Sequence, residues 1–179
     1  MIWRGILMQN SIAEIIGPQG WLRTRRNHAL EHATIQVLSE RHPELRMAGN
    51  SNARGFWIIG NVDIETFQAG LSEALQRLRA GEHDLAIHPN CGTNYASMGL
   101  LAGLAAWIAM LGTRGNWRQR LERLPLVTFL VTLVLILAAP LGPWLQRNLT
   151  TDANIGDLQI EQVDCFERNG FMVYHVRTR

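Results

Sequence analysis

The sequence predicts an α+β membrane protein, in which a small soluble α+β domain built from both chain ends carries an inserted two-helix transmembrane hairpin. Residues 85–113 contain no Asp, Glu, Lys or Arg, and neither do residues 124–146. A helix needs about 20 mainly apolar residues to cross the hydrocarbon core. Segments with helix and strand patterns flank these two runs, and Asn169-Gly170 near the end of the chain is a strong hairpin signal.

The composition excludes several classes of protein. A hydrophobic fraction of 47% with 18% charged residues excludes a disordered chain. A formal net charge of +2 provides no strongly basic face of the kind that nucleic-acid binders need. The two cysteines, Cys91 and Cys165, cannot form a disulfide framework or a four-thiolate zinc site.

The first soluble part covers residues 21–94 and follows an N-terminal arm, residues 1–20. We expect the arm to be amphipathic, lying on the membrane surface or packing on the domain, with Gly17-Pro18 ending its apolar run. Residues 21–41 predict a helix, because one apolar stripe runs along them and the pattern stops before Pro43. The stripe consists of Leu30, Ala33 and Val37.

The rest of this part predicts one more helix and two short strands. Residues 55–59, GFWII, are typical of a buried strand. Asp63 is a suitable N-cap for a helix that Gly81 ends, and the apolar residues of that helix share one face. These are Ile64, Phe67, Leu71, Leu75 and Leu78. We expect a further short strand over residues 85–88.

Residues 95–146 predict the transmembrane hairpin, with spans over 95–112 and 124–144. Pro140 and Pro143 are expected to kink or end the second span. Gly99 and Gly103 form a GxxxG pair that allows close helix packing in lipid. We expect packing against the second span, and the alternative is a docking face for a homo-oligomer or a membrane-complex partner.

The orientation in the membrane rests on two signals that disagree. The connecting loop, residues 113–123, is basic, and the positive-inside rule would place it in the cytoplasm with both soluble parts outside. The first residues do not have the pattern of a signal peptide, which favours soluble parts in the cytoplasm. We adopt the second orientation, with two spans in the cell (inner) membrane.

Residues 147–179 predict a β-hairpin that completes the soluble domain. Strands over residues 157–167 and 171–177, joined at Asn169-Gly170, would set Asp164 opposite His175 as a cross-strand surface pair. Cys165 is expected to act as an ordinary apolar partner in this hairpin.

The candidate site is centred on His28, Glu31 and His32. Positions i, i+3 and i+4 of a helix share one face, so two imidazoles there can chelate one metal ion with a carboxylate beside them. This face lies opposite the apolar stripe. We therefore expect the stripe to pack on the sheet and the histidines to face a cleft or the membrane surface. The alternative is a polar seam or a solvated face without a metal.

A second cluster lies directly before the first span, in EHDLAIHPNCGTN. Pro89 holds the preceding His88 in extended conformation. Our expected ligand set for zinc is His28, His32 and His88, with Cys91 as a substitute ligand and Glu31 as general base. The alternative for Cys91 is structural, because Asn90, Cys91 and Thr93 could cap the span.

Two resemblances bear on this site. His28-Ala29-Leu30-Glu31-His32 is similar to the HxxEH signature of inverzincin metallopeptidases, which implies zinc ligands at His28 and His32 and a water-polarising Glu31. It also implies a third ligand downstream, with Glu73 and Glu82 as candidates. Only these five residues match, and inverzincin domains are larger and contain no such hairpin.

The second resemblance covers roughly residues 25–110. The phrases NHALEHATIQVL, GEHDLAIHPNCGTN and GLLAGLAAW resemble an uncharacterised family of small bacterial and cyanobacterial two-span membrane proteins. This resemblance implies the fold unit and the membrane location and brings no activity with it.

Two functions follow from these observations. One is a membrane-anchored zinc hydrolase, most simply a protease acting near the bilayer. The other is a non-catalytic accessory or assembly subunit that docks through Gly99 and Gly103. Axial ligation of a haem or a chlorophyll-type pigment fits paired histidines of one short helix less well than a single ion does. Two spans without an intramembrane charge provide no transport pathway unless the protein oligomerises.

Overall fold

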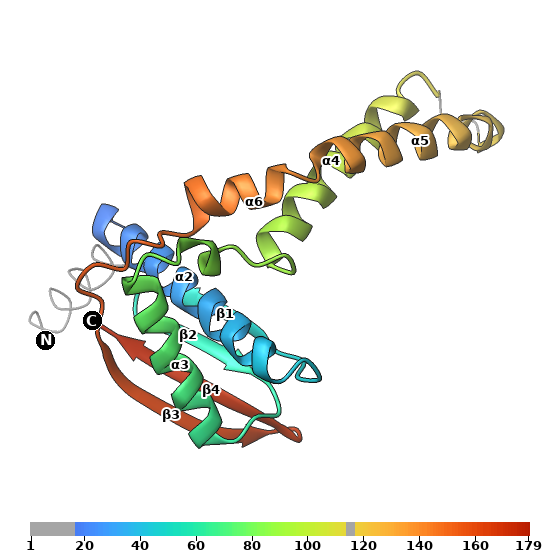
Figure 1. The fold of residues 1–179 in the computed structure, drawn as a ribbon. Helices are drawn as coiled ribbons and strands as arrows, with labels where there is room; N and C mark the ends of the chain where they lie inside the picture. The colour runs from blue at the N-terminus through green and yellow to red at the C-terminus, as the bar shows by residue number, and fades with distance from the viewer. Residues whose placement is uncertain (1–16, 114–116) are drawn as a thin grey trace, which may run out of the picture. The chain divides into compact units, whose positions relative to one another are not determined.

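The computed structural model describes residues 17–113 and 117–179 (Figure 1). Its elements are α2 (Pro18–Arg41), β1 (Ala48–Asn52), β2 (Gly55–Ile59), α3 (Ile64–Arg79), the 3₁₀ helix η1 (His83–Ala86), α4 (Gly92–Met110), α5 (Trp117–Ala138), α6 (Leu141–Leu145), the π-helix η2 (Gln146–Thr150), β3 (Ile160–Arg168) and β4 (Phe171–Thr178). They form two compact units. The first contains the described residues up to His88 together with residues 147–179, and the second contains residues 89–146. The predicted N-terminal arm lies almost wholly outside the described residues.

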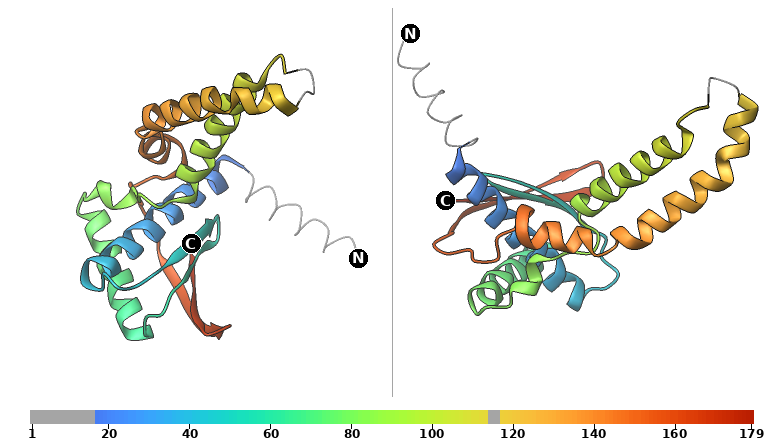
Figure 2. Two further views of the ribbon diagram at one scale, coloured as in Figure 1. Left: turned by 90° about the vertical axis from the view of Figure 1, so that its right-hand side faces the viewer. Right: turned by 90° about the horizontal axis from the view of Figure 1, so that it is seen from above.

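The first unit is built around one antiparallel sheet of four strands in the order β1-β2-β4-β3. The central pair, β2 and β4, joins the two ends of the chain, since Phe56 stands opposite Val176. Helices α2 and α3 cover one face of this sheet (Figure 2). Long-range pairing of this kind makes a domain that cannot form from either chain end alone.

Helix α2 confirms the predicted helix and its apolar stripe. It begins at Pro18 after Gly17 and ends at Arg41, and Leu30, Ala33 and Val37 are completely buried. The expected open face is wrong in part, because His32 is only 2% exposed. Helix η1 packs on this side of α2, and the backbone of residues 150–152 binds it as well, so the helix is enclosed on more than one side.

Helix α3 joins the core through an aromatic contact. Its N-cap is Asp63, as predicted, and the Asp63 carboxylate accepts a hydrogen bond of 2.8 Å from the backbone N–H of Thr66. Phe67 stacks on the buried Tyr174 of β4, with ring centroids 3.9 Å apart. The Tyr174 hydroxyl donates to the carbonyl oxygen of Val62, and burial raises the pKa of this hydroxyl.

One local prediction is wrong, and one strand was missed. Residues 85–88 do not form a strand, because the chain turns through η1 with a hydrogen bond of 3.0 Å from the Ile87 N–H to the Asp84 carbonyl oxygen. Strand β1 was not predicted, since AGNSN has no apolar alternation. It forms because it pairs with β2 along its whole length, from Ala48 opposite Ile59 to Asn52 opposite Gly55.

The C-terminal hairpin is confirmed. Asn169 and Gly170 both have positive φ, at 54° and 80°, which suits a two-residue turn between right-handed strands. Asp164 stands opposite His175, and its carboxylate lies 3.9 Å from the His175 Nδ1. Strand β3 begins at Ile160, later than predicted, because the preceding residues form a turn in which the Leu158 N–H donates to the Ile155 carbonyl oxygen at 3.0 Å.

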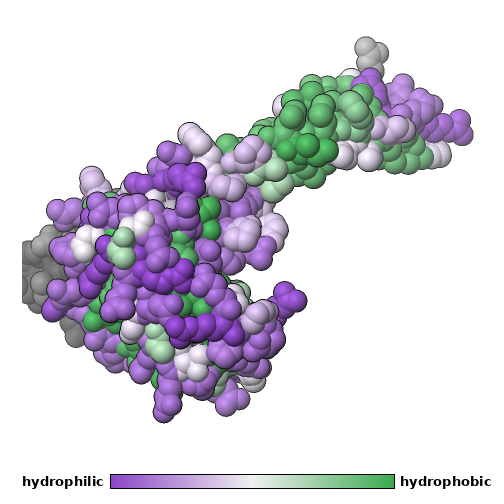
Figure 3. All heavy atoms as spheres, in the orientation of Figure 1, coloured by the Kyte–Doolittle hydropathy of each residue, from purple (hydrophilic) through white to green (hydrophobic). Residues whose placement is uncertain are grey.

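The second unit contains α4, α5 and α6. Within the described part of the chain, α5 is the one helix that is long and apolar enough to cross a membrane. The predicted loop over 113–123 is wrong where it is described, because α5 already begins at Trp117. As the prolines predicted, α5 ends at Ala138 and Pro140 is the N-cap of α6. Figure 3 shows hydrophobic residues gathered over α4 and α5.

The GxxxG pair of α4 does not pack within its own unit. A Cβ atom added at Gly99 or Gly103 would meet no described atom within 4 Å. The buried small residues of α4 are instead Ala105 and Ala109. The expected packing of Gly99 and Gly103 against the second span is therefore wrong, since the alanines occupy the buried side.

Candidate metal centre

His28 and His32 lie one turn apart on α2 with their rings in contact. The ring centroids are 4.2 Å apart, and the two side chains place ligand nitrogens within 4.8 Å of each other. Each Nδ1 lies at hydrogen-bond distance from a backbone carbonyl oxygen. The distance is 3.0 Å from His28 to Thr150 and 2.8 Å from His32 to Ala86.

These two hydrogen bonds assign the tautomer of each ring. A carbonyl oxygen only accepts, so each Nδ1 must carry the proton and donate it. In the neutral form of each ring the lone pair then resides on Nε2. Metal-binding histidines in proteins almost always donate their other ring N–H to a carbonyl or a carboxylate in this way, which fixes the ring orientation. This geometry is compatible with a metal ion, and a metal bound to the pair stays a prediction.

The third predicted histidine ligand, His88, lies beside His32 in the same unit. Its role as a ligand stays a prediction, because the described group of close ligand atoms includes His28 and His32 and not His88. The His88 ring centroid is 5.5 Å from that of His32, and the side chain is half-buried. Burial lowers the pKa of His88, and the nearby His32 lowers it further. Both effects favour the neutral imidazole, which is the form that binds metal ions.

Glu31 is enclosed between α2 and β1. It is 3% exposed, and the Ser51 hydroxyl donates a hydrogen bond to its carboxylate. The fit is close, because a Cβ atom at Gly49 would lie 2.7 Å from the Glu31 carboxyl carbon. Burial raises the pKa of Glu31, while the Ser51 hydrogen bond and the nearby His28 oppose this rise. A raised carboxyl pKa is a common property of general acids and bases.

Thr150 presents a buried hydroxyl without a hydrogen-bond partner among the described residues. Its own carbonyl oxygen is the one that binds His28. Buried hydroxyls are nearly always satisfied, and the exceptions often mark a place for a bound water or ion. The donor set and this hydroxyl are both compatible with a metal ion that carries a water molecule.

The other sequence-predicted ligands have other contacts. Cys91 is the N-cap of α4, as the structural alternative predicted, and its thiol accepts from the Thr93 N–H at 3.4 Å. It belongs to the second unit, and its role as a ligand stays a prediction. Glu73 and Glu82 both form ion pairs with Arg77, at 3.7 and 2.8 Å.

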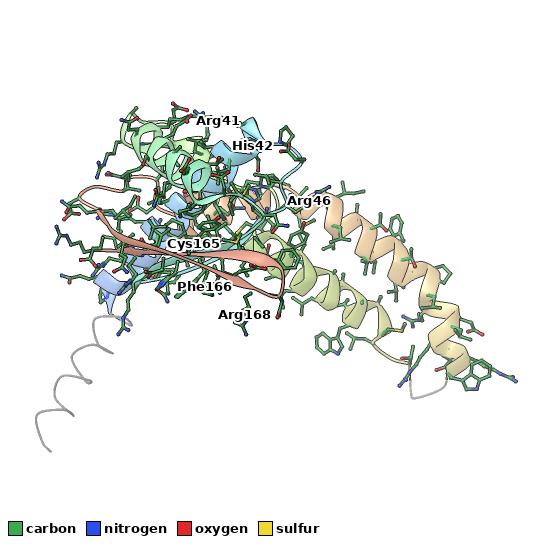
Figure 4. The ribbon with its side chains drawn as sticks, turned by 90° about the horizontal axis from the view of Figure 1, so that it is seen from below. Arg41, His42, Arg46, Cys165, Phe166 and Arg168 are labelled. Atoms are coloured by element: carbon green, nitrogen blue, oxygen red, sulfur yellow. The ribbon has the colours of Figure 1, made fainter. Side chains whose placement is uncertain are left out.

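His42 lies at the end of α2, and Cys165 lies on an edge strand of the sheet. His42 caps the C-terminal end of α2 and lies 3.4 Å from the Glu44 carboxylate (Figure 4). Cys165 is exposed on β3, which is the edge strand farthest from β1 (Figure 4).

One residue of the site was missed from the sequence. The Gln36 carboxamide donates to the carbonyl oxygens of Leu85 and Ile87, at 2.7 and 3.0 Å. Its position four residues after His32 was the available signal, since it continues the histidine face by one turn. Its partners are backbone carbonyls, which carry no sequence signature.

Comparison with known proteins places the chain in a family. The profile of a domain of unknown function, DUF6391, matches residues 23–163. The chain belongs to the DUF6391 family. It is also 35% identical to an uncharacterised protein of Picosynechococcus sp. (strain ATCC 27264 / PCC 7002 / PR-6), over 96% of this chain and 88% of the relative. No solved structure matches the chain.

The match confirms the predicted resemblance to an uncharacterised family with a cyanobacterial member. The DUF6391 region begins within α2 before His28, includes the whole second unit, and ends within β3. The three histidines and Glu31 therefore all lie inside the part of the chain that defines DUF6391.

Proposed function

We propose that this DUF6391 protein binds one zinc ion through His28, His32 and His88, and that it is a membrane-anchored hydrolase of the metallopeptidase type. The observation that supports this most is the pair of Nδ1 hydrogen bonds to Thr150 and Ala86. With Nδ1 protonated, each ring would coordinate a metal through Nε2, in the arrangement that known metal-binding histidines use. Three histidines satisfy a catalytic zinc site that keeps a fourth position for water.

In this proposal the zinc ion supplies Lewis acidity and lowers the pKa of a bound water. Glu31 serves as the general base, held in place by Ser51. The Thr150 hydroxyl is a hydrogen-bond partner for water at the site, because it has no other partner among the described residues. The substrates suited to such a site would be amides or esters, and their hydrolysis would release an amine or an alcohol.

We further propose that α4 and α5 together form a two-span hairpin in the cell (inner) membrane, with the first unit on the cytoplasmic side. Helix α4 has 19 residues and no charged side chain. At 1.5 Å per residue it is about 28 Å long, close to the roughly 30 Å of the hydrocarbon core. Its polar Asn94 is bound by Gln146 at 2.6 Å, which satisfies both side chains at one end of the helix.

Metal content tests the proposed site. Protein purified in detergent is expected to contain about one zinc per chain by mass spectrometry, and His28→Ala and His32→Ala are expected to lose it. His42→Ala is the matched control, because this histidine pairs with Glu44 at the end of α2. Absence of zinc in the wild type, even after zinc is supplied, would refute the hydrolase.

Two further variants separate the roles at the site. Glu31→Gln is expected to retain zinc and to abolish cleavage of a peptide library. Loss of zinc in that variant would make Glu31 a ligand and not a base. Cys91→Ser tests the substitute ligand, since Cys91 follows His88 by three residues, a span of at most about 10 Å. Unchanged zinc content would leave Cys91 as the cap of α4.

The second candidate function is a non-catalytic accessory or assembly subunit, and one observation favours it. Gly99 and Gly103 are open to close approach from outside the unit, as the added Cβ atoms show. Small residues on such a face allow another membrane helix to approach closely. This function predicts a partner that co-purifies and no stoichiometric zinc, so the metal measurement distinguishes the two.

A further inference from the structure

The segment that carries His88 is bound to α2 through three successive backbone carbonyls. Those of Leu85 and Ile87 accept from Gln36, and that of Ala86 lies 2.8 Å from the His32 Nδ1. Two side chains one turn apart on α2 therefore hold the whole segment. His32 therefore contacts the carbonyl of Ala86, and Gln36 binds the carbonyls of the residues directly before and after it.

Gln36 accounts for two of these three contacts. Its Nε2 lies 2.7 Å from the Leu85 oxygen and 3.0 Å from the Ile87 oxygen, so both of its N–H groups are used. Residues 28, 32 and 36 are spaced at i, i+4 and i+8, which places them on one face of the helix. The carboxamide is suited to this task, because it offers two donors in one plane and no charge.

The position of His88 depends on its neighbours along the chain. Ile87 directly precedes it, and the Ile87 carbonyl is held by Gln36. Pro89 directly follows it and restricts the backbone of His88 to extended conformations. With the residue before it anchored and its own backbone restricted, the backbone of His88 is held in place, and its ring lies 5.5 Å from that of His32 by ring centroids.

We propose that Gln36 is the positioning residue of the metal site, which sets His88 as the third ligand and holds the Ala86 carbonyl against His32. This inference rests on the proposed zinc site. Residues that orient metal ligands typically change metal affinity by about 10- to 100-fold when they are substituted. Gln36 acts through the 85–88 segment and has no need to contact the ion.

Zinc affinity of the full chain in detergent tests the inference, measured by competition with a chromophoric chelator. Gln36→Met keeps the size and removes both donors, and Gln36→Glu keeps the shape and sets a carboxylate against two carbonyl oxygens. Both are expected to bind zinc about 10- to 100-fold more weakly than the wild type. The control is Leu78→Ala, which removes a buried side chain of α3 and measures the effect of lost stability alone.

A double-variant cycle shows whether Gln36 acts through His88. In a His88→Ala background, Gln36→Met is expected to have a much smaller effect, because the ligand it positions is gone. An equal effect in both backgrounds would overturn the inference, as would wild-type affinity in both Gln36 variants. A wild type that binds no zinc would refute the proposed site itself, so the two failures are distinguishable.

Discussion

His28 and His32 bind, from one turn of the same helix, the two chain segments that connect the α+β unit with the second unit. His32 reaches the Ala86 carbonyl at 2.8 Å, just before the second unit begins, and His28 reaches the Thr150 carbonyl at 3.0 Å, just after it ends. Arg25 and Gln36 extend the pattern along α2, since Arg25 donates to the Thr151 carbonyl at 2.8 Å. The two candidate metal ligands therefore also hold the two junctions between the units, which we define as residues 85–88 and 148–152.

Metal binding should consequently slow amide hydrogen exchange at the two junctions. Zinc on the two Nε2 atoms would hold both rings still and would strengthen the hydrogen bonds that their Nδ1 atoms donate. We expect slower amide hydrogen exchange in residues 85–88 and 148–152 when zinc replaces a chelator. Peptides from α3 around Phe67 are the internal control, because that residue packs on Tyr174. Equal slowing in both regions would indicate general stabilisation, and no slowing at the junctions would contradict the prediction.

Gly49 is expected to be intolerant of a side chain. A Cβ atom there would lie 2.7 Å from the Glu31 carboxyl carbon, so Gly49→Ala must displace the carboxylate or bend β1. Overpacking of this kind costs about 1–3 kcal/mol. Thermal unfolding followed by circular dichroism measures the loss. Gly92→Ala is the control, because a Cβ atom at Gly92 meets nothing within 4 Å. Equal melting temperatures for the two variants would contradict the close fit of Glu31 on β1.

The free energy of unfolding should depend on pH through the carboxyl group of Asp63. The hydrogen bonds from Thr66, and first of all its backbone N–H, lower the pKa of the Asp63 carboxyl from 3.8. Because the folded-state pKa is lowered, the cap stabilises the fold above about pH 4 and is lost as the pH falls through the folded-state value.

Asp63→Ala should therefore melt below the wild type at pH 7, and the difference should shrink toward pH 3. Asp63→Asn is the matched variant, since asparagine caps helices about as well and does not titrate. A difference between Asp63→Ala and the wild type that stays constant from pH 7 to pH 3 would rule out the ionised cap.

The two sides of α4 should respond differently to the same increase in size. Gly99→Leu and Gly103→Leu are expected to leave the folded protomer intact, because both positions are open. Ala105→Leu is expected to destabilise it, because Ala105 is 8% exposed. Thermal unfolding in detergent compares the variants. If Gly99→Leu destabilises the protomer as much as Ala105→Leu, the outward orientation of the GxxxG pair is wrong.

Helix caps, turns and side-chain spacing could be predicted from the sequence wherever neighbouring residues determine them. Asp63 capped its helix and Asn169-Gly170 made its turn, because both effects act over a few residues. The HxxEH spacing brought His28 and His32 together, since the helix alone sets that distance. The predictions failed where contacts with a distant segment determine the local secondary structure. AGNSN became a strand only because β2 pairs with it, and η1 replaced a strand where α2 binds its carbonyls.

Three features could be predicted from the order of the residues alone: the helix that carries the histidine pair, the two uncharged runs and the closing hairpin. Periodicity, capping and turn chemistry need only nearby residues, so they can be read along the chain. Three features of the candidate site could not be predicted in this way: how enclosed it is, which tautomer each histidine takes, and the contacts of Gln36. These depend on the backbone carbonyls of Leu85, Ala86, Ile87 and Thr150, which every residue type carries alike. Only folding brings such groups within hydrogen-bond reach of α2.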